Sequence, residues 1–308
     1  MKTPIKTTNV GLLLTFIFAF SCSYNKPSGE ADSAYHQEIN DWRNGRIEAL
    51  KNPEGWLSLI GLFTLEEGEN SFGASLANVI VFPTDKAPEV IGSFVLTDEQ
   101  VRVQINAGLE VLHQGEPVSD MIMLSDATGD PTILTLGSLK WYIIKRGDIF
   151  AVRLKDSESV NIQAFEGIDS YPIDLDWRIE AHFRPFDTPK TMEMPTFIGT
   201  VAELTSPGIL EFEIDGQTHQ LDAYAEPEDD EFWLIFGDRT NGKETYGGGR
   251  FLVVDKPGTG QTTYIDFNYA YNPPCAFSDF ATCPLPTARN RLAVEVTAGE
   301  KNYEHGSH

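Results

Sequence analysis

The sequence predicts a mainly β protein, with an N-terminal helix followed by an antiparallel β-sandwich and a second antiparallel β block. After Trp56 the chain consists of short β-favouring runs separated by turn residues, and this spacing indicates a sandwich or barrel rather than a βαβ fold. Residues 101–105 alternate strictly between apolar and polar side chains, as a half-buried strand does.

The composition limits the partners of the protein. Of 308 residues, 41% are hydrophobic, which is enough to build a core and excludes a wholly disordered chain. The chain has 23 Lys and Arg against 46 Asp and Glu, a formal net charge of −23. Because so acidic a protein is repelled by the phosphate backbone, nucleic acid is not an expected partner.

Residues 1–21 predict a lipoprotein signal peptide. Lys2 and Lys6 precede an apolar stretch that is too short to span a bilayer comfortably. The run Ala19-Phe20-Ser21-Cys22 resembles a bacterial lipobox, in which the cysteine is lipidated after cleavage. We therefore expect an exported lipoprotein, anchored to a membrane through Cys22 and facing the periplasm or the cell surface. An ordinary signal peptide, cut near a free Cys22, is the alternative.

A helix should connect this anchor to the β structure. Residues 22–33 are polar and predict a flexible tether. Residues 34–51 place apolar side chains at helical spacing, with Asp32 or Ser33 as the N-terminal cap. The sequence Asn-Pro-Glu-Gly at 52–55 ends the helix.

The first domain is predicted to span residues 34–156. Its order, with Leu-Glu-Glu-Gly at 65–68 ahead of Asn-Ser-Phe-Gly at 70–73, loosely resembles a forkhead-associated sandwich. The arginine and Ser-x-x-His of such domains have no clear counterpart, so phosphopeptide binding is not carried over. The expected strands are 79–82, 93–96, 101–105, 110–113, 122–124, 133–136, 141–144 and 150–154.

The second domain is predicted to span residues 157–303, followed by a tail at 304–308. Asp215-Gly216 is a strong hairpin signal between two of its strands. Whether the two β blocks form one domain is left open. The expected strands are 177–183, 209–214, 218–221, 232–236, 251–254 and 264–267.

Cys275 and Cys283 are the two cysteines that remain if Cys22 carries the lipid. In an oxidising compartment an even pair favours a disulfide. A metal-binding pair is the weaker alternative, because the chain has no other cysteine and no histidine nearby.

Standard catalytic motifs are absent from the sequence. It contains no Gly-x-Ser-x-Gly elbow, no His-Glu-x-x-His and no glycine-rich phosphate loop opening a helix. The acidic run at 226–231 is interpreted as a solvated turn, since its spacing matches no EF-hand loop. We therefore predict neither a metal site nor a cofactor.

The last fifth of the chain carries the candidate ligand-binding or catalytic residues. Polar side chains lie here among aromatic residues and prolines, and any that are buried must pair. A satisfied hydrogen-bond network under a disulfide-closed loop is therefore the alternative to a pocket. The candidates are Arg250, Asp266, Asn268, Tyr269, Asn272, Arg291, Glu300 and Lys301.

The same segment resembles a known family. Asp-Phe-Asn-Tyr-Ala-Tyr-Asn-Pro-Pro-Cys-Ala-Phe at 266–277, Cys-Pro-Leu-Pro at 283–286, Asn-Arg-Leu at 290–292 and Ala-Gly-Glu-Lys at 298–301 are similar to domain of unknown function 1684. Thr287 stands where the family pattern has a second proline. The resemblance implies fold and boundaries, because the family has no established activity.

Two functions fit this sequence. The first is binding of a small or anionic envelope ligand, with Arg250, Arg289 and Arg291 holding an anion and Tyr269 and Tyr271 stacking on an apolar part. The alternative is a hydrolase in which Asp266 is the general base and Asn268 and Arg250 stabilise charge. Glu300 or Asp238 would supply its second carboxylate.

Overall fold

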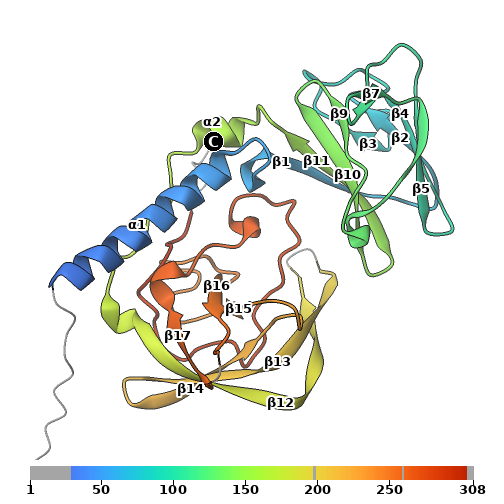
Figure 1. Ribbon diagram of the computed structural model, residues 1–308. Coiled ribbons are helices and arrows are strands. Elements are labelled where there is room, and N and C mark those ends of the chain that lie inside the picture. The colour runs from blue at the N-terminus through green and yellow to red at the C-terminus, as the bar shows by residue number, and fades with distance from the viewer. Residues whose placement is uncertain (1–28, 197–198, 259, 304–308) are drawn as a thin grey trace, which may run out of the picture.

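The computed structural model describes residues 29–196, 199–258 and 260–303, and it confirms a mainly β fold with an N-terminal helix (Figure 1). Two β units are visible, one at each end of the molecule, and helix α1 lies along the second. The predicted signal peptide, Cys22 and the tail at 304–308 fall outside the described residues. Within the described ranges, no helix is long and apolar enough to cross a bilayer.

Helix α1 (Gly29–Lys51) begins earlier than expected. The prediction that residues 29–33 belong to a flexible tether is therefore wrong, and Asp32 and Ser33 lie inside the helix instead of capping it. No proline or glycine interrupts residues 30–44, and acidic residues are favourable near a helix N-terminus. The predicted end is confirmed, because the helix stops directly before Asn52.

The first β unit consists of two sheets. A six-stranded sheet has the order β1-β11-β10-β9-β6-β7, and a five-stranded sheet has the order β3-β2-β4-β5-β8. All pairs are antiparallel except β2 with β3. The strands are β1 (Leu59–Thr64), β2 (Gly68–Gly73), β3 (Ile80–Val81), β4 (Gly92–Thr97), β5 (Gln100–Ile105), β6 (Leu112–His113), β7 (Glu116–Pro117), β8 (Asp120–Met123), β9 (Leu134–Leu136), β10 (Leu139–Arg146) and β11 (Ile149–Asp156).

The two sheets pack face to face as a sandwich. Phe72 of β2 stacks on Phe94 of β4 with 4.3 Å between ring centroids, and its edge meets Trp141 of the other sheet at 5.9 Å. All three side chains are fully buried. One continuous apolar core therefore joins the sheets, as the sequence predicts.

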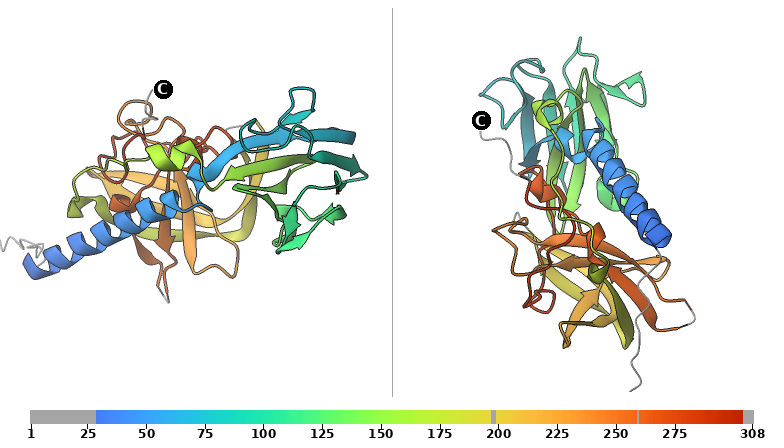
Figure 2. Two further views of the ribbon diagram at one scale, coloured as in Figure 1. Left: turned by 90° about the horizontal axis from the view of Figure 1, so that it is seen from above. Right: turned by 90° about the vertical axis from the view of Figure 1, so that its left-hand side faces the viewer.

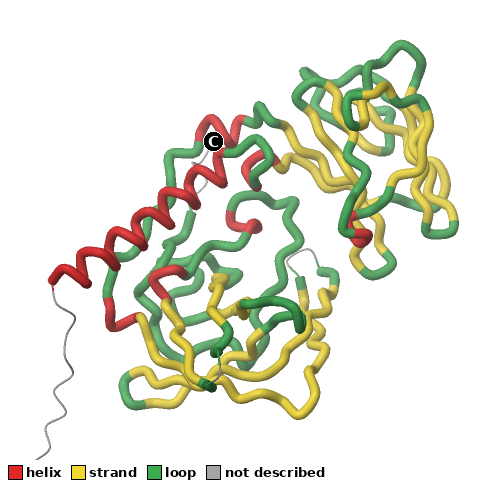
Figure 3. Tube along the Cα trace, viewed as in Figure 1, coloured by secondary structure: helices red, strands yellow, loops and turns green. Residues whose placement is uncertain are grey.

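The second β unit is a curved four-stranded sheet with a two-stranded hairpin inside it (Figures 1 and 3). The sheet order is β14-β13-β12-β17, and the hairpin pairs β15 with β16. Asp215 and Gly216 both have positive φ, 51° and 72°, and form the predicted tight turn. The strands are β12 (Arg178–Pro195), β13 (Val201–Ile214), β14 (Gln217–Ala223), β15 (Glu231–Phe236), β16 (Arg250–Asp255) and β17 (Thr262–Asp266).

Irregular chain completes the second unit. Residues 267–303 contain no strand and cross the unit as loops (Figure 3). Their buried apolar residues join the core between the sheet and the hairpin. The short helices outside α1 are α2 (Val160–Ala164) and the 3₁₀ turns Trp56–Ser58, Asp126–Thr128, Leu175–Trp177, Phe267–Tyr269 and Pro274–Ala276.

Helix α1 is fastened to the second unit. Tyr35 and Glu38 bond to residues of the segment 266–269, and Arg46 bonds to Glu300. The sequence analysis assigned this helix to the first domain, together with the sandwich. In the structure it covers one side of the second unit, and its side chains contact the C-terminal segment that resembles the family.

Candidate functional site

Arg250 lies inside the second unit and lines neither of the two pockets described below. Its guanidinium is fully buried, donates a 2.9 Å hydrogen bond to Asp238 and bonds to the carbonyls of Val296, Ala298 and Glu300. A guanidinium sealed in this way cannot reach a ligand. The structure therefore does not place Arg250 where the predicted anion-binding or charge-stabilising role needs it, and Asp238 is its buried partner.

Glu300 and Asn272 form a second buried network beneath helix α1. Glu300 accepts hydrogen bonds from Arg46 Nε at 2.8 Å and from the Asn272 backbone N–H at 2.6 Å. The Asn272 side chain donates to the carbonyl of Lys301 at 2.7 Å. Both predicted site residues, Glu300 and Asn272, thus attach the helix to the C-terminal segment.

The remaining basic candidates lie apart from one another. Arg291 is exposed, beside Gly237. Arg289 pairs with Asp222 at 3.3 Å, and the Lys301 ammonium lies 4.7 Å from the centroid of the Tyr171 ring. The arginine cluster expected from Arg250, Arg289 and Arg291 is not formed, because Arg250 is buried in β16 whereas the other two lie at the surface of the irregular C-terminal segment.

Asp266 and Tyr269 are predicted residues that line a pocket. Asp266 ends β17, and its carboxylate accepts hydrogen bonds from the Tyr35 hydroxyl at 2.7 Å and from the backbone and side-chain amides of Asn268. Arg178 lies 3.9 Å away. Asn268 is fully buried and also bonds to the backbone of Asp174, so it positions Asp266 without facing the pocket itself.

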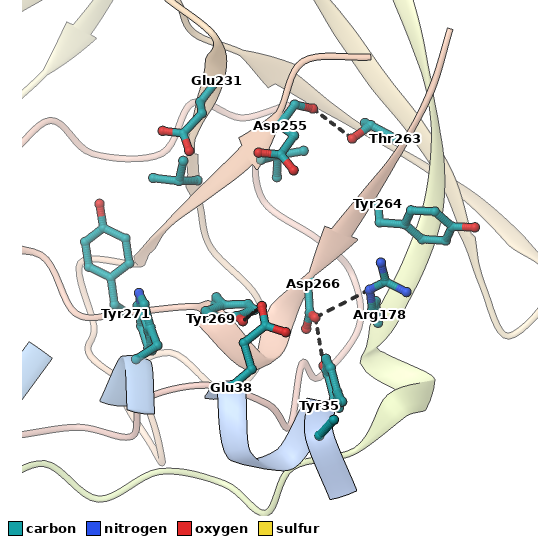
Figure 4. Close-up of a pocket in the computed structure, with 14 residues that line it drawn as sticks. Tyr35, Glu38, Arg178, Glu231, Asp255, Thr263, Tyr264, Asp266, Tyr269 and Tyr271 are labelled. Atoms are coloured by element: carbon teal, nitrogen blue, oxygen red, sulfur yellow. Dashed lines mark hydrogen bonds and ion pairs between the residues drawn. The ribbon is translucent and has the colours of Figure 1, made fainter. Parts of the chain in front are cut away.

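A pocket of about 790 Å³ lies between helix α1 and strands β15, β16 and β17 (Figure 4). We call it the tyrosine pocket. Tyr269 lines it and donates a 2.7 Å hydrogen bond to Glu38 of the helix. Trp42 meets the Tyr269 ring edge-on at 5.1 Å. The polar and aromatic lining residues are Tyr35, Glu38, Trp42, Arg178, Glu231, Asp255, Thr263, Tyr264, Asp266, Tyr269 and Tyr271.

The charge of the tyrosine pocket is negative. Four carboxylates line it, those of Glu38, Glu231, Asp255 and Asp266, against the single guanidinium of Arg178. Burial raises the pKa of Asp266, and the hydrogen bonds from Tyr35 and Asn268 oppose that shift only in part. The pocket therefore favours groups that donate hydrogen bonds or carry positive charge.

A second pocket of about 570 Å³ adjoins the first and shares Trp42, Val253 and Tyr271 with it. It lies where the first β unit, helix α1 and the C-terminal segment meet. We call it the arginine cleft. Its charged and aromatic lining residues are Trp42, Arg46, Trp56, Arg146, Arg153, Trp233, Phe251 and Tyr271.

The predicted disulfide joins Cys275 to Cys283 and forms part of the wall of the arginine cleft. Both cysteines are buried. No cluster of three or more metal-binding side chains occurs among the residues that the structure describes.

Sequence reasoning missed the arginine cleft. Arg146 and Arg153 come from the first β unit and Trp56 directly precedes it, whereas the other residues of the cleft come from helix α1, the β15–β16 pair and the C-terminal segment. The one usable signal in the sequence was the type of these residues, since arginine and tryptophan side chains lie near the ends of neighbouring predicted helices and strands. Their meeting depends on how the two units pack.

The profile of the family described as "Protein of unknown function (DUF1684)" matches residues 163–301. Residues 163–301 thus form a region of this family. A solution NMR structure of an uncharacterized protein from Haloarcula marismortui is 32% identical, with 45% of this chain and 78% of that chain covered and a TM-score of 0.39. No curated protein matches the sequence.

The DUF1684 match covers Asp266, Tyr269 and the disulfide but not helix α1 or the first β unit. Tyr35, Glu38 and Trp42 of the tyrosine pocket thus come from outside the matched region. So do Arg146 and Arg153 of the arginine cleft. Both pockets are formed where the DUF1684 region meets chain that precedes it.

Proposed function

We propose that this DUF1684 protein is an exported, lipid-anchored protein that binds a small molecule in the tyrosine pocket. The observation that carries the proposal is the position of Asp266 and Tyr269. They are predicted site residues from the C-terminal segment, and they line a pocket of about 790 Å³ roofed by helix α1. That volume suits a small organic ligand, as typical ligand sites hold roughly 300–1,000 Å³.

The lining indicates what kind of molecule fits. Glu231 and Asp255 lie directly opposite each other in the β15–β16 pair, and like charges in that position repel. A ligand that brings hydroxyl or ammonium donors relieves this repulsion, whereas an anion would increase it. The rings of Tyr264, Tyr269 and Tyr271 offer flat surfaces for its apolar faces. The proposed ligand is therefore a donor-rich small molecule, such as a saccharide or an amine.

Thermal unfolding in the presence of candidate ligands tests this proposal. A ligand at about 100 times its dissociation constant should add about 2.7 kcal/mol of stability. A panel of neutral oligosaccharides and polyamines should contain compounds that raise the melting temperature, and Asp266→Asn should reduce that shift. Asp148→Asn, in an exposed turn of the first unit, is the matched control and should leave it unchanged. The absence of any shift across the panel would count against the pocket.

The proposed location is supported by the lipobox-like run that ends in Cys22. A lipidated Cys22 would hold the folded body at a membrane, because each buried CH₂ of an acyl chain contributes about 0.8 kcal/mol. Membrane fractions washed with salt and carbonate should retain the native protein and lose Cys22→Ala. Retention of the variant would refute the anchor.

Hydrolysis is a second candidate function, and one observation favours it. Asp266 combines a raised pKa with a position in a pocket, and such carboxyl groups suit acid–base catalysis. Neither proposed charge stabiliser is available, because Arg250 and Asn268 are fully buried and paired. Binding is therefore the better-supported function. Turnover of a bound ligand that stops in Asp266→Asn, with the ligand still bound, would reverse this preference.

A further inference from the structure

We propose that the arginine cleft is a separate binding site for an organic oxyanion, a carboxylate or phosphate ester attached to a flat apolar group. This inference goes beyond the function proposed above, since it concerns a different pocket with the opposite charge. It is carried by the state of one residue, Arg153 of β11.

Arg153 is buried without a counterion. The residue is only 5% exposed, yet no carboxylate lies within ion-pair distance of it among the described residues. Its Nη atoms make long hydrogen bonds to two neutral hydroxyls, at 3.5 Å to Tyr142 and 3.3 Å to Thr282. Its Nε has no partner in the described structure. Since a guanidinium has five N–H donors, most of its hydrogen-bonding capacity is unused.

Such an arrangement is costly for the unliganded protein. An unpaired charge in the interior costs several kcal/mol, and buried arginines are normally paired. The chain has twice as many acidic as basic residues, so carboxylates to neutralise an arginine are not scarce. An incoming oxyanion would supply the missing acceptors and the missing charge.

The surroundings of Arg153 increase the positive potential. Arg46 and Arg146 also line the cleft, each already paired, with Glu300 and Asp126 respectively at 2.8 Å. No Asp or Glu lines the cleft. Lys155 also lies near the Trp56 ring, and burial, together with the charge of Arg153, lowers the pKa of its ammonium group.

Aromatic contacts do not replace a counterion here. The Arg153 guanidinium lies 5.6 Å from the Trp56 ring centroid and 5.9 Å from that of Tyr142. Cation–π contacts at such distances are weak compared with an ion pair, and they offer no hydrogen-bond acceptor in the plane of the guanidinium. They hold the guanidinium in place and leave its N–H groups for a ligand.

The chemistry of the walls defines the ligand class. A guanidinium recognises planar or tetrahedral oxyanions through two parallel hydrogen bonds. Trp233, Phe251 and Tyr271 provide apolar surface beside it, and the volume of about 570 Å³ admits a ring of small-molecule size. Low-polarity walls also strengthen the attraction between the charges.

Calorimetric titration of the full chain with small probes tests the proposal. Phenyl phosphate and benzoate carry both the anion and the ring, inorganic phosphate carries the anion alone, and phenol carries the ring alone. At fixed ionic strength, the ring-bearing anions should bind most tightly. Comparison of the first two probes shows which oxyanion is preferred.

Variants separate this site from the others. Arg153→Met should weaken binding of the ring-bearing anions at least tenfold without lowering the melting temperature, because it removes an uncompensated buried charge. Arg102→Met is the matched control, since Arg102 is half exposed and pairs with Asp120 on the surface; it should bind as the native protein does. Asp266→Asn should also retain anion binding, so that failure of the tyrosine pocket is distinguished from failure of this site.

Three results would overturn the proposal. The first is no binding of either ring-bearing anion at millimolar concentration, and the second is equal affinity in Arg153→Met. The third is a melting temperature that falls in Arg153→Met while affinity is kept, which would assign Arg153 a purely structural role. If Arg153→Met does not fold, Arg153→Lys decides, because it keeps the charge but loses the two-pronged geometry. Unchanged affinity in Arg153→Lys would then refute the site.

Discussion

The Tyr35 hydroxyl of helix α1 donates a 2.7 Å hydrogen bond to the Asp266 carboxylate at the end of β17, across 231 positions of sequence. The same hydroxyl accepts a hydrogen bond from the Asn268 side chain at 2.9 Å. Burial is the main reason that the pKa of Tyr35 is raised, so the phenol remains a donor at physiological pH. This contact attaches the helix over the tyrosine pocket and fixes the orientation of Asp266 within it.

Tyr35→Phe should lower the free energy of unfolding by about 1–3 kcal/mol. The substitution keeps the ring but removes one bond to a charged acceptor and one bond from an amide, leaving both partners less satisfied. Urea unfolding provides the measurement. Tyr264→Phe is the matched control, because Tyr264 is 45% exposed and its hydroxyl lies 3.4 Å from Glu180. Equal losses of unfolding free energy in the two variants would show that the buried contact of Tyr35 contributes no more than an exposed hydroxyl does.

The ionisation of Asp266 should make the native protein less stable, relative to Asp266→Asn, as pH rises. Burial raises the folded-state pKa of Asp266 above its unfolded value of about 3.9. The fold therefore favours the protonated form. That contribution is complete below the unfolded pKa and is lost as pH rises through the folded pKa. Urea unfolding of the native and variant proteins between pH 3.5 and 7 would measure the difference.

Asp156 provides a control with the opposite sign. Burial opposes its ionisation, but hydrogen bonds from Lys86, Glu158 and Ser138 outweigh burial and lower its pKa. Its contribution should be present above the unfolded pKa and be lost as pH falls through the folded pKa. A native-minus-variant difference that follows the same pH trend for Asp266→Asn and Asp156→Asn would contradict the assignment.

Local patterns predicted much of the fold. Residues 101–105 alternate in the sequence and alternate in burial within β5, because a strand half exposed to water must do so. The sequence analysis missed β1 and β2, whose sequences contain glycine and polar residues that blur the alternation. It also ended a strand at Phe183, whereas β12 continues to Pro195. Pro185 and Pro189 discouraged the extension, and the register shift between Pro185 and Lys190 accommodates them.

The candidate site was harder to predict for a physical reason. The sequence shows that the C-terminal segment holds polar residues that either pair with one another or face a ligand. It does not show which of the two applies to each residue. Arg250 pairs and Asp266 lines a pocket, although 16 positions separate them. Arg153 was missed for the opposite reason. In the sequence it is an ordinary polar residue of a strand, and only tertiary packing buries it without a carboxylate partner.

Removal of the disulfide should destabilise the protein by roughly 2–3 kcal/mol, the chain-entropy value for so short a loop. Cys275 and Cys283 are eight positions apart and pack in a small apolar cluster with Leu59 and Phe251. The double variant Cys275→Ala/Cys283→Ala should therefore unfold at lower urea concentration. Native protein treated with a reductant should approach the same midpoint. An unchanged midpoint in both cases would mean that packing alone holds this loop.

Among the charged contacts described above, the Arg250–Asp238 pair should cost the most unfolding free energy when one partner is replaced. Arg250→Met leaves a buried carboxylate and three buried carbonyls without their donor, and breaking a buried pair from one side typically costs about 3–5 kcal/mol. Adding Asp238→Leu removes the stranded carboxylate, so the double variant should lose less than the sum of the single variants. Arg184→Met is the surface control: the Arg184 side chain, which pairs with Glu211, is 62% exposed, and ion pairs at the surface contribute about 0–1 kcal/mol. Urea unfolding of the native protein and the four variants, including Asp238→Leu alone, measures these differences. A loss below about 1 kcal/mol in Arg250→Met would refute the structural role and return Arg250 to the candidates for ligand binding. The contrast with Arg153→Met is the sharper test, since Arg250 pairs with the Asp238 carboxylate and three backbone carbonyls, whereas Arg153 has no carboxylate partner among the described residues.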